Sequence, residues 1–271
     1  MNNLRFPGGK KKAFTLSFDD GVTDDRRFIG IINRFGLKGT FNLNSYSLTH
    51  AGGREKVTVE ELGTLYQGHE IAVHTWSHPC PSETFSGNFA YEIMKDRELL
   101  EQYTGRIIRG MAYPMGSTYI MEDNAKTVRQ CGIAYARTTG ATKKFGLPGN
   151  WILLDPTCHH TDSDCLDLLE QFFGMDVLYG VQMFFLWGHT YEFSDNQNWE
   201  LAEKIARIAG GREDVWYATG IEIHDYVEAA RRMVASADGR ILYNPTCTKI
   251  WYQSGSDVIT ISPDETVCVD G

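Results

Sequence analysis

The sequence has no long apolar run and no pair of cysteines in C-x-x-C spacing. A transmembrane helix needs about 20 consecutive apolar residues, so we expect no membrane-spanning segment. The N-terminal stretch MNNLRFPGGKKK also lacks the apolar core of a signal peptide. The six scattered cysteines argue against a zinc ribbon or a thioredoxin-like motif and favour reduced thiols. These absences predict a cytoplasmic protein.

Long runs of Lys and Arg are absent as well. The chain carries 26 Lys and Arg against 35 Asp and Glu, which gives a formal net charge of −9. Proteins whose main partner is nucleic acid or an anionic membrane surface usually show the opposite balance. We therefore expect neither partner, and the sequence leaves the oligomeric state open.

Strand-like and helix-like segments alternate along most of the chain. Apolar residues recur at helical spacing in one segment, and another begins with a capping-box pair, as shown by Phe28, Ile31, Ile32 and Phe35 and by Thr58 and Glu61. Further helices are expected at 88–103, 121–131, 164–173, 197–209 and 221–235, and strands at 13–18, 38–44, 69–74, 107–113, 133–137, 181–187 and 214–218. This order indicates an α/β protein with a mostly parallel sheet, in the form of a barrel or near-barrel.

The length and composition fit one large domain, since the chain has 271 residues of which 42% are hydrophobic. The helical pattern stops near Arg240, and short β-like runs follow at 240–243, 247–252 and 257–269. We predict a barrel domain over 1–239. Residues 240–271 are expected to form a small antiparallel β appendage that packs on the barrel and is not an independent domain.

Two adjacent carboxylates stand where the first expected strand ends, in the stretch "SFDDG". Asp19 and Asp20 are compatible with an ordinary turn and helix start, because Asp and Gly favour both. Active sites of α/β barrels, however, lie on the loops that follow the strands. Two neighbouring carboxylates repel each other, so a bound cation is a natural reason to keep both ionised.

Two histidines follow another expected strand, in the stretch "HTWSH". His74 and His78 have a spacing that also occurs on a polar helix edge or in a pair of core histidines. At the end of a barrel strand they are candidates for metal ligands, and neutral imidazole suits zinc, cobalt or nickel.

"SFDDG" and "HTWSH" together resemble the first two motifs of the polysaccharide deacetylase family, the chitooligosaccharide-deacetylase homology domain of carbohydrate esterases. The resemblance extends from about Ala13 to Ala235 and implies a distorted (β/α) barrel, here of six to eight parallel strands. It implies that Asp19 is the general base. It also implies that Asp20, His74 and His78 bind one divalent metal ion, with zinc expected and cobalt or nickel as alternatives.

The third family motif, Arg-Pro-Pro-Tyr-Gly, is altered to the stretch "RGMAYPMG". Ala112 stands where the resemblance places the arginine that orients the base, so Arg109 and Arg137 are the two candidates for this role. The backbone N–H of Met115 takes the position of the oxyanion donor. Tyr113 is expected beside it, in contact with substrate.

The stretch "WGH" at the end of the strand 181–189 resembles the fifth motif and makes His189 the candidate general acid, although a structural histidine is the alternative. The fourth motif, which orients this acid in the family, is not recognisable. Its region contains His159, His160 and Asp162, for which additional pocket residues, a second metal site and an exposed polar loop remain open. Aromatic residues near the motifs could stack on sugar rings or belong to the core: Trp76, Tyr113, Tyr119, Trp151, Trp187 and Tyr191.

The resemblance therefore implies a metal-dependent deacetylase that hydrolyses the amide of an N-acetylated sugar or a related N-acyl compound. The expected substrate is a small molecule or an oligosaccharide. One alternative is a cyclic amide hydrolase of the ureide type with the same fold. Another is a metal-bearing carbohydrate-binding protein without catalysis, because two motifs are degenerate.

Overall fold

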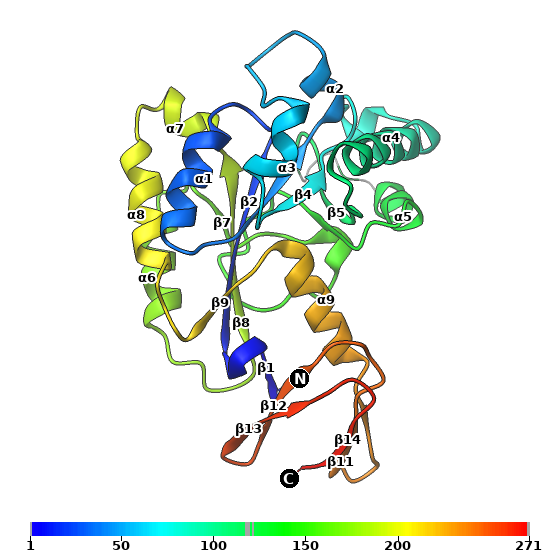
Figure 1. Ribbon diagram of the computed structural model, residues 1–271, viewed down its shortest axis with the longest axis vertical. Helices are drawn as coiled ribbons and strands as arrows, with labels where there is room; N and C mark the ends of the chain where they lie inside the picture. The colour runs from blue at the N-terminus through cyan, green and yellow to red at the C-terminus, as the bar shows by residue number, and fades with distance from the viewer. Residues whose placement is uncertain (1, 117–119, 121, 270–271) are drawn as a thin grey trace.

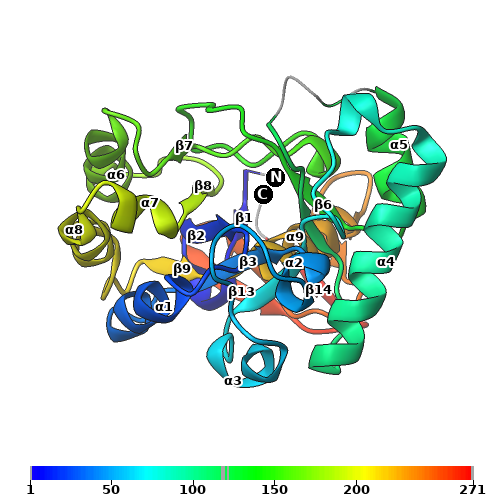
Figure 2. The same ribbon diagram turned by 90° about the horizontal axis from the view of Figure 1, so that it is seen from above.

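The computed structural model describes residues 2–116, 120 and 122–269. Its centre is an eight-stranded sheet with the order β6-β5-β4-β3-β2-β8-β7, in which β9 also pairs with β2. All pairings in this sheet are parallel. The strands are β2 (Lys12–Asp19), β3 (Gly39–Leu43), β4 (Glu70–Val73), β5 (Gly110–Ala112), β6 (Tyr135–Arg137), β7 (Cys158–His159), β8 (Gln182–His189) and β9 (Val215–Tyr217). The sheet curls, which confirms the expected distorted (β/α) barrel (Figure 2).

Helices surround the curled sheet (Figures 1 and 2). They are α1 (Asp25–Arg34), α2 (Ser45–Thr49), α3 (Leu62–Leu65), α4 (Ser86–Thr104), α5 (Glu122–Gln130), α6 (Cys165–Gly174), α7 (Tyr191–Asp195), α8 (Trp199–Ala209) and α9 (Gly220–Arg231). The apolar residues spaced at i, i+3 and i+4 in α1 are buried, as their periodicity requires. The capping box of Thr58 and Glu61 is also present. Within the described ranges, no helix is both long and apolar enough to cross a bilayer.

The C-terminal region forms two small antiparallel sheets. One joins β1 (Leu4–Arg5), β12 (Ile250–Ser254) and β13 (Asp257–Ile261), and the other joins β10 (Val234–Ala235), β11 (Ile241–Tyr243) and β14 (Thr266–Cys268). Figure 1 shows both below the barrel, near the start of β2. β12 pairs with the N-terminal β1, and the Tyr226 hydroxyl of α9 accepts a hydrogen bond from the Trp251 N–H at 3.0 Å, so the C-terminal strands contact the rest of the chain. The boundary between the two parts at residue 239 stays a prediction.

The prediction of one helix over 221–235 is wrong at its end. Helix α9 stops at Arg231, and Val234 and Ala235 pair with β11 instead.

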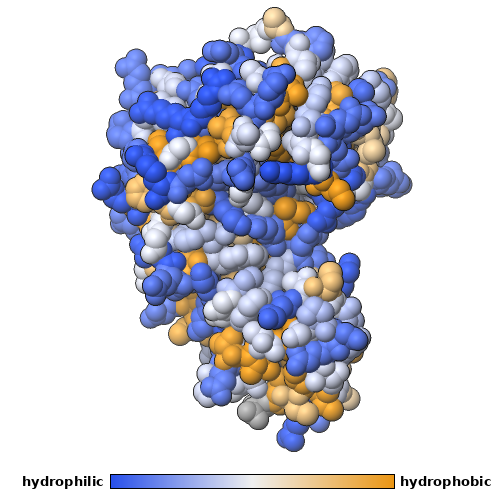
Figure 3. Space-filling view, viewed as in Figure 1, coloured by the Kyte–Doolittle hydropathy of each residue, from blue (hydrophilic) through white to orange (hydrophobic). Residues whose placement is uncertain are grey.

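Hydrophobic residues gather at the lower end of the molecule, over the C-terminal strands, whereas the upper end is mainly hydrophilic (Figure 3). Since β2 begins at the lower end, the carboxyl ends of the parallel strands, and the loops that follow them, lie at the upper end.

A buried carboxyl group joins the first helix to two other elements. Asp25, the first residue of α1, accepts hydrogen bonds from the Tyr66 hydroxyl at 2.7 Å and from the Thr190 hydroxyl at 2.6 Å. Its side chain is 1% exposed. Burial raises the pKa of Asp25 to about 7, against the opposing effect of the two hydrogen bonds. The folded state therefore binds a proton at this position more tightly than the unfolded chain does.

We predict that Asp25→Asn makes stability less dependent on pH. Because the folded pKa is above the unfolded value near 4, the stability that Asp25 contributes is complete below pH 4 and is lost as the pH rises through 7. Urea denaturation at pH 5 and pH 8 should show that the variant gains about 2 kcal/mol or more relative to the wild type between the two pH values, since one pKa unit corresponds to about 1.4 kcal/mol. The exposed Asp257→Asn is the matched control. An equal difference from wild type at both pH values would contradict the prediction.

Candidate active site

The polar side chains of the motifs lie at the carboxyl ends of neighbouring strands. Asp19 ends β2 and pairs in register with His189, which ends β8. His74 directly follows β4, and Arg137 ends β6. Because the strands are parallel and the sheet is curled, these ends converge on one region of the barrel.

Asp19 is held by a buried arginine. Its carboxylate is 3% exposed and accepts hydrogen bonds from Nη2 of Arg137 at 2.6 and 2.5 Å and from Nδ2 of Asn42 at 2.8 Å. Burial opposes ionisation of Asp19, but the positive charge of Arg137 outweighs it, and the pKa of Asp19 falls to about 2. The carboxylate is therefore an anion with a fixed orientation.

Arg109, one of the two candidates for orienting Asp19, does not contact this carboxylate. Its guanidinium forms an ion pair with Asp225 of α9, with Nη1 3.1 Å from Oδ1. The reason is the direction of the strands: Arg109 precedes β5 and lies at its amino end, whereas Arg137 is the last residue of β6. Of the two candidates, Arg137 is the one that contacts Asp19.

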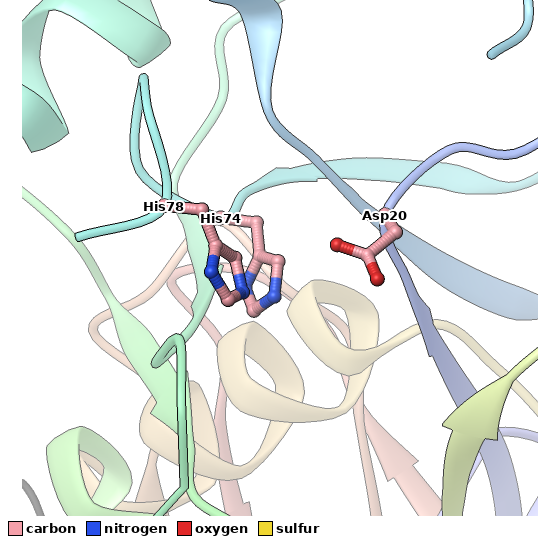
Figure 4. Close-up of side chains that lie close together, drawn as sticks. All are labelled: Asp20, His74 and His78. Carbon is pink, nitrogen blue, oxygen red and sulfur yellow. The ribbon is translucent and has the colours of Figure 1, made fainter. Parts of the chain in front are cut away.

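Asp20, His74 and His78 lie together. Each offers one ligand atom, and these atoms lie within 4.8 Å of one another. Figure 4 shows the two imidazole rings and the carboxylate facing a common space. Asp20 and His78 both have left-handed backbone conformations, with φ of 80° and 59°. Non-glycine residues in this conformation are uncommon and often mark functional sites.

The surroundings of His74 fit a metal ligand. Its Nδ1 lies 2.9 Å from the carbonyl oxygen of Ala112, which accepts the Nδ1 proton and leaves the Nε2 lone pair available. Its backbone N–H donates to the buried carboxylate of Asp96 on α4 at 3.0 Å. Burial, together with the nearby His74, lowers the pKa of His78 to about 4, which keeps that imidazole in its neutral, metal-binding form. Two imidazoles and one carboxylate are a donor set that suits zinc.

His189 lies between two carboxylates. Its Nε2 is 3.9 Å from Oδ2 of Asp19, and its Nδ1 is 3.5 Å from Oε1 of Glu192. Burial disfavours the charged ring, but the two carboxylates outweigh this effect and raise the pKa of His189. Sequence reasoning missed Glu192. The available signal was its position three residues after His189, at the start of the short helix α7.

His159 and His160 contact the same glutamate. The Nε2 atoms of the two histidines lie 3.2 Å and 3.5 Å from Oε2 of Glu192. His159 belongs to β7 and pairs in register with Trp187, and His160 is 1% exposed. An exposed polar loop is therefore the wrong interpretation for these two residues. It suits Asp162 better, which forms an ion pair with the half-exposed Lys143 at 2.6 Å.

Space for His160 depends on a glycine in β8. A Cβ atom at Gly188 would lie 1.9 Å from Nδ1 of His160, so a larger residue there would displace this imidazole. The absence of a side chain at Gly188, between Trp187 and His189, thus makes room for the His160 ring.

The other predicted site residues differ in whether they lie at the site. Met115 follows β5 with φ of 66° and a largely exposed side chain, and the role of its N–H stays a prediction. Trp187 packs against Arg137, whose guanidinium carbon lies 4.5 Å from the ring centroid. Tyr113 does not contact the site: it is buried, and its hydroxyl donates to the carbonyl of Ile152 at 3.1 Å. The expectation that Tyr113 binds substrate is wrong.

A hollow of about 290 Å³ lies beside the metal-ligand group. Its lining includes Asp20, His78, Trp76, Tyr46 and Tyr191. Two of the expected sugar-stacking residues, Trp76 and Tyr191, are therefore at this hollow. Trp151 is buried elsewhere, with its indole N–H donating to Glu228 at 2.8 Å. Tyr119 lies outside the described residues.

The comparisons agree with the motifs. The polysaccharide deacetylase family model matches residues 7–136. The chain is 24% identical over 191 residues to the peptidoglycan-N-acetylglucosamine deacetylase PgdA of Listeria monocytogenes serotype 1/2a (strain 10403S), a match that covers 64% of this chain and 40% of that protein. The chain thus spans well under half the length of this curated relative.

Solved structures share the fold at low sequence identity. A protein from Mycobacterium smegmatis assigned to the polysaccharide deacetylases is 18% identical with a TM-score of 0.61, covering 85% of this chain and 95% of that one. A family 4 carbohydrate esterase from Streptomyces lividans, solved with acetate, is 13% identical with a TM-score of 0.51, covering 77% of this chain and 93% of that one. At such identities the likeness concerns the fold.

We predict that His78→Ala weakens zinc binding by at least tenfold. The change removes one of three ligands, whereas loss of a group that only supports a ligand already costs 10- to 100-fold. Equilibrium dialysis of zinc against chelator-treated protein measures the effect at low zinc concentration. The exposed His50→Ala is the matched control and should bind zinc as the wild type does. Unchanged zinc affinity in His78→Ala would show that the three side chains do not form a metal site.

Proposed function

Because the chain belongs to the polysaccharide deacetylase family, which its residues 7–136 match, we propose that it is a metal-dependent deacetylase. In this proposal it hydrolyses the amide bond of an N-acetylated sugar or a related N-acyl compound. The observation that carries the proposal is the position of His189, whose Nε2 lies 3.9 Å from the Asp19 carboxylate, beside the group of Asp20, His74 and His78. In this proposal, the proton acceptor, the proton donor and the metal ligands lie at one end of the barrel.

Asp20, His74 and His78 would hold the metal ion, for which we propose zinc. When bound, such an ion polarises the carbonyl of the amide and lowers the pKa of a bound water to about 7. The chain contributes the orientation of the ligands, because the Ala112 carbonyl fixes the His74 tautomer.

Asp19 would accept the proton of the attacking water. The hydrogen bonds from Arg137 and Asn42 hold its carboxylate in one orientation, and its low pKa keeps it ionised across the neutral range. Arg137 in turn lies against the ring of Trp187, which restricts the movement of the guanidinium. In this mechanism the arginine and the tryptophan are positioning residues.

His189 would protonate the leaving amine. Asp19 and Glu192 on its two sides favour the imidazolium, which is the form that this step needs. Glu192 would also fix the ring through Nδ1, the duty that the unrecognised fourth motif has in the family. The backbone N–H of Met115 would stabilise the oxyanion.

The substrate is proposed from the site and from a relative. The relative PgdA is a peptidoglycan-N-acetylglucosamine deacetylase, and Trp76 and Tyr191 beside the ligand group could stack on a sugar ring. A ureide-type hydrolase and a protein that only binds carbohydrate are less well supported. The three metal ligands lie together, and binding alone would require neither Asp19 nor His189. A cytoplasmic location stays a prediction.

We predict that the zinc-loaded protein releases acetate from oligomers of N-acetylglucosamine and that Asp19→Asn lowers this rate by about 10²- to 10⁴-fold. The reason is that the variant loses the proton acceptor while all three metal ligands remain. Metal content and melting temperature are measured in parallel, because the substitution also leaves Arg137 without its counter-charge. Asp24→Asn, at the start of α1, is the matched control. Equal rates in Asp19→Asn and wild type would remove Asp19 from the mechanism.

We predict that His189→Ala impairs hydrolysis of the amide far more than hydrolysis of an activated aryl ester with the same acyl group. An amine leaves only after protonation, whereas an aryloxide leaves without it. Glu192→Gln should show the same selectivity to a smaller extent, because the ring is kept but loses one of its two carboxylate neighbours. Equal losses for both substrates, with a lowered melting temperature, would instead assign His189 a structural role.

A further inference from the structure

A second group of metal-ligand type lies beside the first. His159, His189 and Glu192 each offer one ligand atom, and these atoms lie within 4.8 Å of one another. The three side chains come from β7, from the end of β8 and from α7. We propose that this group binds a second divalent cation of the kind that imidazole and carboxylate ligands prefer, such as zinc.

The carboxylate of Glu192 lies between the two histidines of this group. Its Oε2 lies 3.2 Å from Nε2 of His159, and its Oε1 lies 3.5 Å from Nδ1 of His189. One carboxylate thus faces a nitrogen of each ring, and an ion could lie among these three atoms. The other nitrogen of His159, Nδ1, lies 2.7 Å from the hydroxyl oxygen of Thr161. The backbone N–H of Thr161 donates to the same Nδ1 at 3.2 Å, so Thr161 fixes the orientation of the His159 ring.

His160 provides an independent observation. It is 1% exposed, and neither of its ring nitrogens has a hydrogen-bond partner among the residues that the structure describes. Its Nε2 lies 3.5 Å from Oε2 of Glu192, so the ring is directed at the same group. A buried polar atom without a partner is costly and requires an explanation. An ion at this position, or a water bound to that ion, would give His160 a partner.

The charge of the group also favours a cation. Within the described part of the chain, every ion-pair partner of Glu192 is a histidine. With neutral imidazoles, the group carries the single negative charge of the glutamate. A divalent ion would satisfy this charge without displacing an arginine or a lysine.

The effect of this ion on catalysis rests on the proposed function. An imidazole that binds a metal through Nδ1 is no longer an imidazolium, so His189 could not protonate the leaving amine. The first ion would then support turnover, and the second would inhibit it. Since the two groups use different side chains, both ions can be bound at the same time.

The test is the number of ions bound by the full chain. Chelator-treated protein is titrated with zinc, and bound zinc is measured by metal analysis after dialysis. We expect two ions per chain in the wild type, one in His159→Ala, which retains Asp20, His74 and His78, and one in His78→Ala, which retains the second group. The exposed His50→Ala is the matched control and should bind two. Titration with cobalt gives a second readout, since the visible spectrum of each variant should lack the contribution of the lost site.

Saturation of the wild type at one ion, or two ions in His159→Ala, would overturn the proposal. If His159→Ala does not fold, Glu192→Gln takes its place, and retention of two ions by that variant has the same meaning. Inhibition is measured as the ratio of turnover at excess zinc to turnover at one equivalent, separately for each protein. A ratio well below one is expected in the wild type and a ratio near one in His159→Ala. Two bound ions without inhibition would leave the second site intact and contradict the role of His189 as general acid.

Discussion

The buried ion pair between Asp19 and Arg137 is the interaction on which the candidate site depends. The two side chains are 3% and 0% exposed, and removing one partner of such a pair typically costs about 3–5 kcal/mol. Asp19 ends β2 and Arg137 ends β6, two strands with β5, β4 and β3 between them in the sheet. The two groups meet only because the sheet curls. The barrel shape and the charge at its centre are therefore coupled, since a flatter sheet would separate these two charges.

From this pair, carboxylate and imidazole side chains alternate outward through the site. The carboxylate of Asp19 is followed by the ring of His189 at 3.9 Å, by Glu192 at 3.5 Å and by His159 at 3.2 Å. Burial opposes ionisation of both groups, but Arg137 and His189 lower the pKa of Asp19, and Glu192 and Asp19 raise the pKa of His189. The arrangement thus separates the protonation states of two neighbouring groups, the proposed base Asp19 and the proposed acid His189. The cation proposed among His159, His189 and Glu192 would act on this ring directly, since His189 is one of its three ligands.

Sequence reasoning succeeded where a local pattern determines the outcome and failed where partners come from distant parts of the chain. The periodicity of α1 and the apolar run of β2 are local, and so is the position of each motif at the end of a strand. The pairing of Arg109 with Asp225, 116 residues away, has no such signal. The same holds for Glu192, whose contact with the distant residue His159 forms only when the chain folds. At Val234, pairing with a strand formed later in the sequence prevailed over the helical pattern that precedes it.

The neighbouring carboxylates of Asp19 and Asp20 serve different partners because the backbone turns between them. Asp19 is still in β2, and its side chain faces Arg137, whereas Asp20 has φ of 80° and its side chain faces the two histidines. A left-handed conformation costs a non-glycine residue about 1–3 kcal/mol, so other contacts must maintain it. The N–H of Asp20 donates to the Asn42 carbonyl at 2.9 Å, and its carbonyl accepts from Lys56 at 2.8 Å. His78 and Met115, in the loops after β4 and β5, have the same unfavourable conformation, with φ of 59° and 66°. In three loops of the site the backbone thus adopts a locally unfavourable conformation, and in two of them, at Asp20 and His78, it places a proposed metal ligand. The fixed ends of the parallel strands make these conformations possible.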